Sequence, residues 1–403
     1  MNEIIVQKFG GTSVGSVERI DAVAEIIKKA SQSNRIVVVV SAMGGETNKL
    51  VNLAKNFSDN PDKREFDALV ATGETVSSAL LAMALHSKGL KAKSYSASQI
   101  SMRTTDSFSK AKILDVDAKK ILEVLEEDTI PIITGFQGIT ETGDVTTLGR
   151  GGSDTTAVAI AAQVKAERCD IYTDVDGIYT TDPKIVPNAK KLDSITMEEM
   201  LELAGQGAKV MQTRAVEFAN KYEVPVRVLS SFNESTGTLI SLKEDTMENA
   251  LVSGIASQKN QVKFTLHGVG DIPGTAFKIL GPISDAEVEV DVIVQNVSVD
   301  GKTDFTFTVS SEDQGTVNKV IQEMNDVEYK ELIVNSDIAK VSLVGVGMRS
   351  QAGVASRAFK ALSEKDVNIQ IICTSEIKIT MVIDESLVDK AVKVLHEEFE
   401  LDK

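Results

Sequence analysis

Short runs of β-branched and aliphatic residues alternate with helical patterns from Met1 to about Leu229. The runs at residues 36–40, 130–134, 169–173 and 226–229 have the composition of buried strands, and stretches with helical periodicity separate them. Strands that alternate with helices form a mostly parallel sheet covered by helices on its faces. The sequence therefore predicts an α/β fold for this part of the chain.

The last third of the chain contains an internal repeat that is weak in identity but consistent in pattern. Residues 263–270 (KFTLHGVG) align with residues 340–347 (KVSLVGVG), and a glycine turn then opens a helix in each copy. Two strands with period-2 apolar patterns follow, at 288–294 and 305–309 in the first copy and at 367–373 and 377–383 in the second. Each copy thus predicts β-α-β-β and a closing helix, a ferredoxin-like scaffold that hosts many functions.

A polar, turn-rich stretch at residues 230–237 and a charged run at 243–248 separate these two parts. We place the domain boundary between residues 245 and 246, with a catalytic candidate at 1–245 and the repeat region at 246–403. The repeat units are expected at about 262–335 and about 338–403, and residues 251–256 are expected to complete the second unit.

Composition limits the classes of function. A chain of 403 residues with 42% hydrophobic residues can bury a large core, and its net charge of −16 argues against a nucleic-acid or anionic-membrane partner. Two cysteines, Cys169 and Cys373, are too few for a disulfide framework and are expected to be free thiols in a reducing compartment. The N-terminus lacks a signal-peptide pattern, and no apolar stretch approaches about 18 residues. We therefore expect a cytoplasmic protein without a membrane span.

The first motif, Lys8-Phe9-Gly10-Gly11-Thr12-Ser13, lies where a predicted strand ends and a helix begins near Ser16. Two glycines let backbone N–H groups approach a phosphate, the helix N-terminus favours negative charge, and Lys8 supplies a cation. The motif is a candidate phosphate cradle, although a strand-ending turn alone can have this sequence.

The second motif, residues 146–156 (TTLGRGGSDTT), is also rich in glycine and also leads into a helix, expected at 157–164. Glycines flank Arg150, so its guanidinium can present a planar fork of donors that suits bidentate binding of a carboxylate. Asp154 lies in the first helical turn, where it can act in the site or merely complement the helix dipole.

The third motif, residues 173–184 (TDVDGIYTTDPK), closes the predicted strand at 169–173. Its acidic residues are too closely spaced for a calcium loop. Tyr179 can flank an adenine and Lys184 can reach phosphates, while the alternative is a polar turn with an Asp-Pro break.

Taken together, in this order and at this spacing, the three motifs resemble the signature loops of the aspartokinases in the amino-acid kinase family. The resemblance covers essentially the whole chain, because aspartokinases of this length end in two ACT domains of βαββαβ topology. It implies phosphorylation of the side-chain carboxylate of L-aspartate by ATP with Mg²⁺, and feedback inhibition by lysine, threonine or both. It also implies a homo-oligomer that forms through the ACT units.

The resemblance assigns residues to the site in three groups. Lys8 and Asp154 are the implied catalytic residues, and Lys8 stabilises the transferring phosphoryl group. The nucleotide is placed against Lys8, Phe9, Gly10, Gly11, Ser41, Thr173, Asp174, Tyr179, Lys184, Lys209 and Val210. Aspartate is placed against Thr47, Glu74, Arg150, Gly151, Gly152, Ser153 and Asp154. Protein ligands alone are not expected to hold a metal.

Effector-binding residues are implied at the glycine turns and strand ends of the two ACT units. In the first unit they are Asp271, Gly274, Thr275, Ala276, Asp291 and Gln295. In the second they are Val354, Ala355, Asn368, Ile369, Thr374, Ser375 and Glu376. The chain departs from the family pattern at three places. Lysine stands at position 184, where arginine is frequent, and Glu289 stands where relatives often have asparagine. Gly281-Pro282 is expected to interrupt the helix of the first unit.

The chemistry of the residues agrees with this assignment. A carboxylate nucleophile with an ordinary pKa of about 4 is already ionised at neutral pH, so the transfer needs no general base. The three histidines, His86, His267 and His396, lie outside the three motifs and are read as structural or surface residues. Glu74, at the predicted start of a helix, can pair with the substrate ammonium or serve only as an N-terminal helix charge.

Two alternatives remain open at this stage. One is a related kinase that acts on glutamate or acetylglutamate. The Arg150-Gly-Gly-Ser-Asp loop together with the ACT repeat disfavours this alternative. The other is a non-catalytic amino-acid sensor, which the presence of Lys8, Glu74 and Arg150 disfavours.

Overall fold

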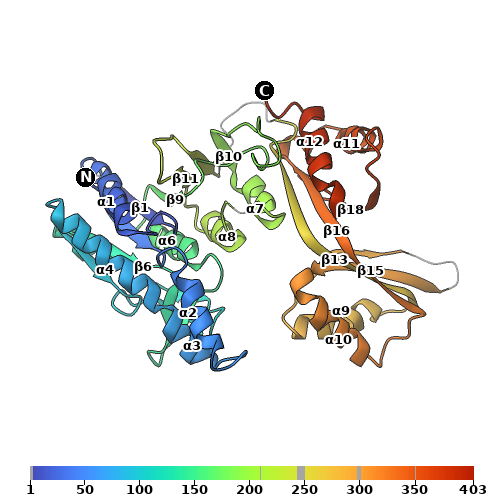
Figure 1. Cartoon of the computed structure of the whole chain (residues 1–403), viewed down its shortest axis with the longest axis horizontal. Helices are drawn as coiled ribbons and strands as arrows, with labels where there is room; N and C mark the ends of the chain where they lie inside the picture. Colours follow the sequence, from blue (N-terminus) through green and yellow to red (C-terminus); the bar gives the residue numbers. More distant parts are fainter. Residues whose placement is uncertain (1–2, 209, 243–249, 297–300, 350) are drawn as a thin grey trace. The chain divides into compact units, whose positions relative to one another are not determined.

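The computed structural model describes residues 3–208, 210–242, 250–296, 301–349 and 351–403. The chain divides into two compact units (Figure 1). The first comprises Met1–Tyr179, Lys191–Gly205 and Lys209–Met247, and the second comprises Thr180–Lys190, Gln206–Ala208 and Glu248–Lys403. The boundary expected at 245/246 lies outside the described residues.

An eight-stranded sheet forms the centre of the first unit. Its strands, in spatial order, are β10 (Ser194–Thr196), β12 (Thr238–Ser241), β11 (Val226–Ser230), β9 (Arg168–Thr173), β1 (Ile4–Phe9), β2 (Arg35–Val40), β6 (Ile130–Thr134) and β3 (Ala92–Tyr95). All neighbouring pairs are parallel except β11 with β12, which confirms the predicted fold class. The central strands are buried on both faces, as their unbroken apolar runs require.

Helices cover both faces of this sheet. Helices α1 (Val17–Ser31) and α4 (Thr72–Ser87) share a core with Ile5, Val38 and Ile132. Helix α6 (Gly152–Gln163) packs on β1, β2 and β9, and α8 (Thr213–Lys221) packs on α6. The remaining helices are α2 (Glu46–Lys55), α3 (Lys63–Val70), α5 (Ala118–Glu126) and α7 (Met197–Gly205).

A small sheet of β5 (Ile113–Asp115), β4 (Arg103–Thr104), β7 (Gln137–Ile139) and β8 (Val145–Thr147) lies beside α3. Within the described residues, the segment Lys63–Ser87 is the one helical run long and apolar enough to span a membrane by length and composition. Leu81 and Leu85 of this segment belong to the core of the first unit, and half of its most apolar window is buried. The segment is therefore accounted for as a core helix.

The second unit contains a six-stranded antiparallel sheet with helices packed against it. In spatial order its strands are β14 (Asp291–Gln295), β15 (Lys302–Ser310), β13 (Gly254–Gly270), β16 (Glu331–Val344), β18 (Lys378–Asp384) and β17 (Ile369–Thr374). Helices α9 (Thr275–Asp285) and α10 (Gln314–Glu323) cover the first repeat, and α11 (Val354–Ser363) and α12 (Val388–Glu398) cover the second.

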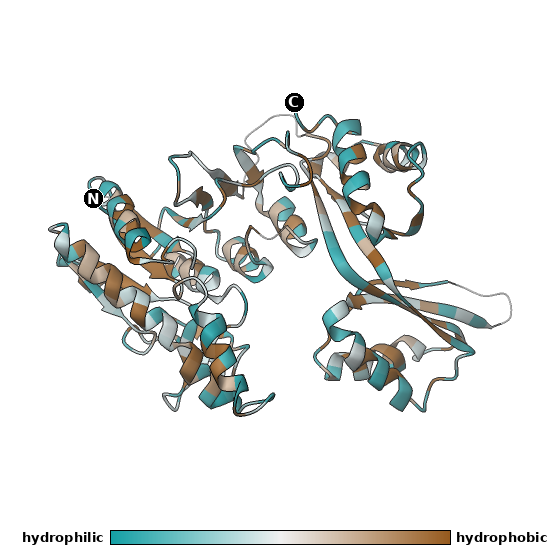
Figure 2. Ribbon diagram, viewed as in Figure 1, coloured by the Kyte–Doolittle hydropathy of each residue, from teal (hydrophilic) through white to brown (hydrophobic). Residues whose placement is uncertain are grey.

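Two long strands, β13 and β16, serve both repeats. Residues 254–258 of β13 pair with residues 340–344 of β16, and residues 261–267 pair with residues 331–338. Each strand therefore completes one βαββαβ unit and begins the other, although the completing strand starts at Gly254 rather than Leu251. Figure 2 shows bands of hydrophobic and hydrophilic residues along both strands, and the last seven residues of β16 are buried.

Two expectations about helices need correction. Helix α9 runs without interruption to Asp285 although Pro282 lies inside it. Only the last turn follows Pro282, so the missing N–H removes one hydrogen bond near the helix end rather than breaking the helix. Helix α6 begins at Gly152, five residues before the alanine-rich stretch that predicted it, because Gly151 adopts a left-handed conformation and starts the helix directly.

The segment Thr180–Lys190 packs with the second unit, and Val186 lies in that unit's core. Thr180 Oγ1 is 3.0 Å from Nε2 of His396, which is buried and whose pKa is lowered by burial. His396 is thus structural, as expected. Both cysteines are free thiols, with Cys169 buried and Cys373 exposed.

Candidate active site

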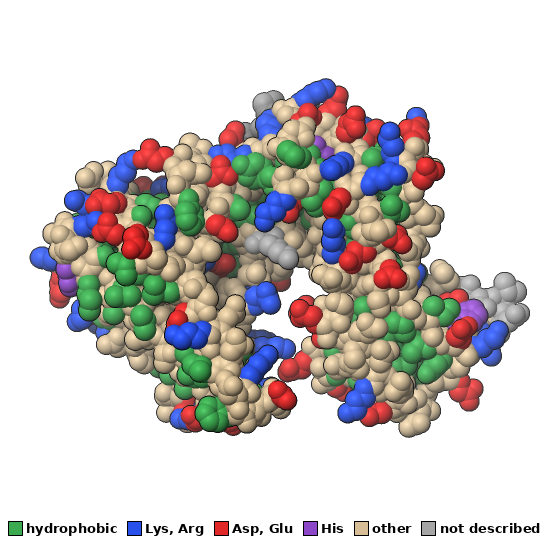
Figure 3. Space-filling model, viewed as in Figure 1, with side chains coloured by type: hydrophobic (Ala, Val, Ile, Leu, Met, Phe, Trp, Pro, Cys, Tyr) green, Lys and Arg blue, Asp and Glu red, His purple; other side chains and the backbone are tan. Residues whose placement is uncertain are grey.

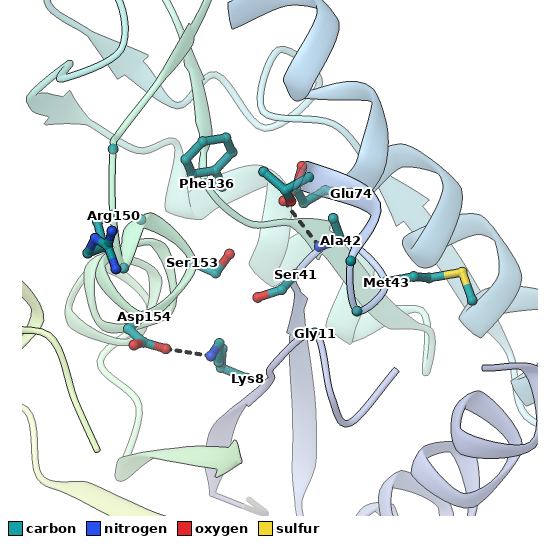
Figure 4. A pocket seen from close by; sticks show the side chains of 16 residues that line it. Lys8, Gly11, Ser41, Ala42, Met43, Glu74, Phe136, Arg150, Ser153 and Asp154 are labelled. Carbon is teal, nitrogen blue, oxygen red and sulfur yellow. Dashed lines mark hydrogen bonds and ion pairs between the residues drawn. The ribbon is translucent and has the colours of Figure 1, made fainter. Parts of the chain in front are cut away.

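A pocket of about 320 Å³ opens at the carboxyl ends of β1, β2 and β6 (Figure 4). In open α/β sheets this edge is where ligands bind, because loops and helix N-termini converge there. The lining comes from the loops after these three strands and after β8, from α2, from α4 and from the start of α6. The lining residues are Lys8, Gly11, Ser41, Ala42, Met43, Gly44, Gly45, Thr47, Glu74, Phe136, Gly149, Arg150, Gly151, Gly152, Ser153 and Asp154.

All seven residues predicted to surround the substrate line this pocket. Of the two predicted catalytic residues, Lys8 projects from β1 and Asp154 from the first turn of α6, and Lys8 Nζ lies 2.6 Å from Asp154 Oδ1. Both side chains are about nine-tenths buried. Without a ligand, each charge is therefore neutralised by the other.

Arg150 lies on a backbone that requires glycine on both sides. Gly149 and Gly151 have φ values of 77° and 70°, which disfavour any side chain. A Cβ on Gly151 would also lie 2.0 Å from Cγ of Gln212. The exposed Arg150 side chain contributes to the pocket wall, and among the described residues no carboxylate pairs with its guanidinium.

Glu74 is almost completely buried at the start of α4. Its Oε1 accepts a hydrogen bond of 3.1 Å from the N–H of Ala42, while Oε2 has no partner among the described protein atoms. Burial raises the pKa of Glu74 from 4.5 to about 7, against the opposing effect of the backbone hydrogen bonds. A buried carboxyl oxygen that lacks a partner is available to a ligand that brings a donor.

The predicted nucleotide-binding residues are brought together only in part. Lys8, Gly11 and Ser41 line the pocket, whereas Phe9 is buried in the core and stacks on Tyr172 with ring centroids 4.6 Å apart. Thr173 ends β9, the neighbour of β1, and Asp174 and Tyr179 follow this strand. The Tyr179 hydroxyl donates to Asp176. Gly10 lies directly after β1, and Val210 belongs to the first unit. Lys184 belongs to the second unit, and Lys209 lies outside the described residues.

The sequence interpretation missed six lining residues, one of which is Gly149, directly before the predicted Arg150. Four of them, Ala42 to Gly45, form a third glycine loop that directly follows β2, so a strand followed by a Gly-Gly pair could have revealed them. The remaining one is Phe136, which follows β6 with a φ of 70°. No sequence pattern distinguishes Phe136 from an ordinary loop residue.

In the first ACT unit, the turn that opens α9 and the end of β14 lie together. Gly274 is left-handed, with Thr275 and Ala276 in the first turn of α9, and Gln295 Nε2 donates to Asp271 Oδ1 at 3.4 Å. Asp291, at the other end of β14, is instead 2.6 Å from the buried Lys340. Although burial opposes its ionisation, the hydrogen bond and charge of Lys340 keep the pKa of Asp291 below its usual value.

In the second ACT unit, the predicted effector residues lie at both ends of β17. Asn368 and Ile369 stand at its start, and Thr374, Ser375 and Glu376 at its end. Val354 and Ala355 begin α11 after the left-handed Gly353. Arg349, just before this turn, forms an ion pair of 3.2 Å with Glu376, so the end of β17 lies beside the turn.

Comparison with known proteins defines the class. The chain matches the Amino acid kinase family over residues 3–230 and the ACT domain over residues 341–399. The parallel sheet, the pocket at its carboxyl edge and the antiparallel six-stranded sheet are those of an amino acid kinase followed by ACT units.

Relatives of similar length narrow the class. The chain is 56% identical to the aspartate kinase of Stutzerimonas stutzeri, covering 99% of this chain and 98% of that one, and 48% identical to the aspartokinase of Helicobacter pylori, covering 99% and 100%. A crystal structure of Escherichia coli aspartokinase III in complex with aspartate and ADP matches with a TM-score of 0.84 at 28% identity, covering 98% of this chain and 99% of that one. This chain belongs to the aspartate kinases, and its activity is that of an aspartate kinase.

Proposed function

We propose that the enzyme transfers the γ-phosphate of MgATP to the side-chain carboxylate of L-aspartate, giving 4-phospho-L-aspartate. The observation that carries this proposal is a cationic guanidinium and a buried carboxyl group, both without partners, in one pocket. Arg150 has no carboxylate partner among the described residues, and the buried Oε2 of Glu74 has none either. In Figure 4 the two side chains stand apart across the pocket, as the α-carboxylate and ammonium of an amino acid require.

In this arrangement Arg150 binds the α-carboxylate through its fork of donors, and Glu74 accepts the ammonium. Thr47 and Ser153 complete the polar wall. The side-chain carboxylate is left to face Lys8. One of its oxygens attacks the γ-phosphorus while the bond from that phosphorus to the bridging oxygen of ADP breaks, and no proton needs to be removed.

Lys8 stabilises the charge on the transferring phosphoryl group, and Gly10 and Gly11 allow a close approach of phosphate oxygens. Asp154 holds Lys8 in place before the nucleotide binds, since the two groups are 2.6 Å apart. Thr173, Asp174, Tyr179, Lys184, Lys209 and Val210 are proposed to bind the rest of the nucleotide. A neighbour solved with aspartate and ADP supports the pairing of these two substrates.

The described residues contain no cluster of three or more His, Cys, Asp or Glu side chains that could hold a metal. A single carboxylate, Asp154, faces the phosphate side of the pocket, which fits an ion held mainly by phosphate oxygens and water. When bound, Mg²⁺ would neutralise charge on the β- and γ-phosphates.

The ACT region is proposed to mediate feedback inhibition by lysine, threonine or both, as befits the first step towards lysine, threonine and methionine. A related aspartokinase III of Escherichia coli was solved with lysine and aspartate, at a TM-score of 0.78 and 29% identity. We further propose a cytoplasmic homo-oligomer that forms through the ACT units.

An acceptor screen with MgATP tests the reaction. Acyl phosphate trapped as the hydroxamate should form with aspartate and not with glutamate or acetylglutamate. Equal product from glutamate would contradict the proposed geometry, because the longer side chain would then also reach the phosphoryl group from the same Arg150 and Glu74 contacts.

A further inference from the structure

A buried carboxylate beside the active site has no role in the mechanism described so far. Asp67, in α3, is fully buried, and no Lys, Arg or His forms an ion pair with it among the described residues. A buried charge without a counter-charge is costly unless hydrogen bonds replace its hydration. The partners of Asp67 therefore indicate what the carboxylate stabilises.

Four hydrogen bonds converge on Asp67, two from Ser109 and two from Thr147. The N–H groups of these residues donate to Oδ2 at 2.8 and 2.7 Å, and their hydroxyls donate to Oδ1 at 3.1 and 2.9 Å. Thr147 ends β8, and Arg150 follows it three residues later. Asp67 thus fixes the strand end from which the Arg150 loop departs.

The next residue of the loop is also fixed. Arg214 donates to the carbonyl oxygen of Leu148 at 2.7 Å and to that of Ala111 at 2.8 Å, and Ala111 N–H donates to Thr147 O at 2.9 Å. Gly149 and Gly151 are both left-handed, so the backbone around Arg150 has little steric preference of its own. Anchors outside the loop must therefore set the position of the guanidinium.

The helix that carries Asp67 continues into the helix that carries Glu74. Helices α3 and α4 follow each other directly (Figure 1), and Ala71 between them accepts a hydrogen bond of 2.9 Å from Gln137, next to the pocket residue Phe136. One helical segment therefore carries Glu74 itself and, through Asp67, holds the loop that carries Arg150.

We propose that Asp67 is a positioning residue for the aspartate site, which keeps the Arg150 guanidinium in register with the Glu74 carboxylate. The inference rests on the proposed function, in which Arg150 and Glu74 bind the two ends of the amino acid. It predicts that Asp67 controls the Michaelis constant for aspartate through Arg150 and leaves ATP use nearly unchanged.

The test compares Asp67→Ala, Asp67→Asn and Asp170→Ala in the full-length enzyme. Asn can accept both N–H groups at its oxygen and donate its amide to the two hydroxyls, so it should stay within about threefold of wild type. Ala should raise the KM for aspartate by about tenfold or more while kcat and the KM for ATP change by less than about threefold. Asp170, a buried carboxylate of β9 paired with Arg168 and Arg227, is the matched control, and its loss should lower Tm without this selective rise.

A double-mutant cycle separates positioning from general destabilisation. In an Arg150→Ala background, Asp67→Ala should change the aspartate KM by no more than about twofold, because the group that it positions is gone. If Asp67→Ala folds poorly, Thr147→Val, which removes one hydroxyl bond, should give a rise of about twofold to fivefold.

The outcomes are distinguishable. An equal rise in both backgrounds, or parallel losses for aspartate and ATP, would overturn the positioning role while leaving Arg150 in the site. An Arg150→Ala variant with normal aspartate kinetics would overturn the proposed function and this inference together.

Discussion

The same local structure, a left-handed glycine that opens a helix, occurs in the catalytic pocket and in both ACT units. At Gly151 the turn is enclosed, with Ser153 and Asp154 each 8% exposed. At Gly274 and Gly353 an added Cβ would meet nothing within 4 Å, and Ile272 and Phe277 beside the first of these turns are 63% and 79% exposed. The helix N-terminus offers the same N–H groups at all three turns. The catalytic turn differs because it is buried and because charged side chains of both signs surround it, which makes it a complete binding site.

The pocket and the molecular surface also differ in how charged side chains are distributed. Figure 3 shows Lys and Arg side chains interspersed with Asp and Glu on the visible face of both units, whereas the pocket gathers two buried carboxylates and a buried lysine. We infer that the ACT turns need a second subunit to complete an effector site. Substitutions in the pocket should therefore impair catalysis or substrate binding, and substitutions at the ACT turns should only change the regulation of the enzyme.

The largest effect is expected for Lys8→Ala. Removing a cation aimed at the transferring phosphoryl group should lower kcat by about 10²- to 10³-fold, with little change in the KM for ATP. Initial rates at varied ATP would check this, with the exposed Lys29→Ala as control. A loss confined to the KM for ATP would remove Lys8 from the transition state.

Arg150→Lys should be the next most severe change. Lysine keeps the charge but loses the planar fork, so the KM for aspartate should rise by about tenfold to a hundredfold while the KM for ATP stays near the wild-type value. Steady-state kinetics with both substrates varied measure the two constants separately. Unchanged aspartate kinetics would place Arg150 outside the substrate site.

Glu74→Gln should weaken aspartate binding and yet stabilise the protein at alkaline pH. The folded-state pKa of about 7 exceeds the ordinary value of 4.5. Glu74 thus contributes stability below about pH 4.5 that is lost as the pH rises through 7, on the order of 3 kcal/mol when complete. The variant should therefore have a higher Tm than wild type at pH 8.5 and a similar Tm near pH 4.5. A lower Tm at both pH values would argue against a buried carboxylate without a counter-charge.

The smallest effect on catalysis is expected at the first ACT turn. Gln295→Ala removes the 3.4 Å hydrogen bond between the turn and β14, and Asp271→Asn removes the negative charge of its acceptor. They should raise the inhibitory concentration of lysine or threonine by about fivefold or more and leave uninhibited kcat nearly unchanged. Assays with each amino acid alone and with both would check this, with the exposed Asp326→Asn as control. Parallel loss of basal activity and inhibition would show that sensor and catalyst are not separable.

The sequence predicted the parts of the fold that depend on local pattern. The strands at 36–40, 130–134 and 169–173 were found from apolar runs, and the repeat from its period-2 strands. Helix α6 was placed too late because its first turn, Gly-Ser-Asp-Thr-Thr, has the composition of a loop, and tertiary burial overrides that preference. The strand β16 was predicted only from residue 340, because its first half has a mixed polar pattern and pairs with β13 across a long separation.

The site was predictable where a motif marks it and unpredictable where only packing does. Lys8, Arg150 and Asp154 lie in glycine motifs, and all seven predicted substrate residues line the pocket. The contacts of Asp67 with Ser109 and Thr147 join residues 42 and 80 positions apart, and no local pattern records them. The raised pKa of Glu74 likewise depends on burial by distant segments.

The most direct test of the enclosed catalytic site is the proton linkage of aspartate binding. Aspartate binding should ionise the buried Glu74, so calorimetry in buffers of different ionisation enthalpy should detect release of close to one proton near pH 6 and almost none at pH 8.5. The affinity for aspartate should rise with pH through about 7, and Glu74→Gln should abolish both effects. If aspartate binds with the same affinity at both pH values and no proton is released, the buried Glu74 does not bind the substrate ammonium.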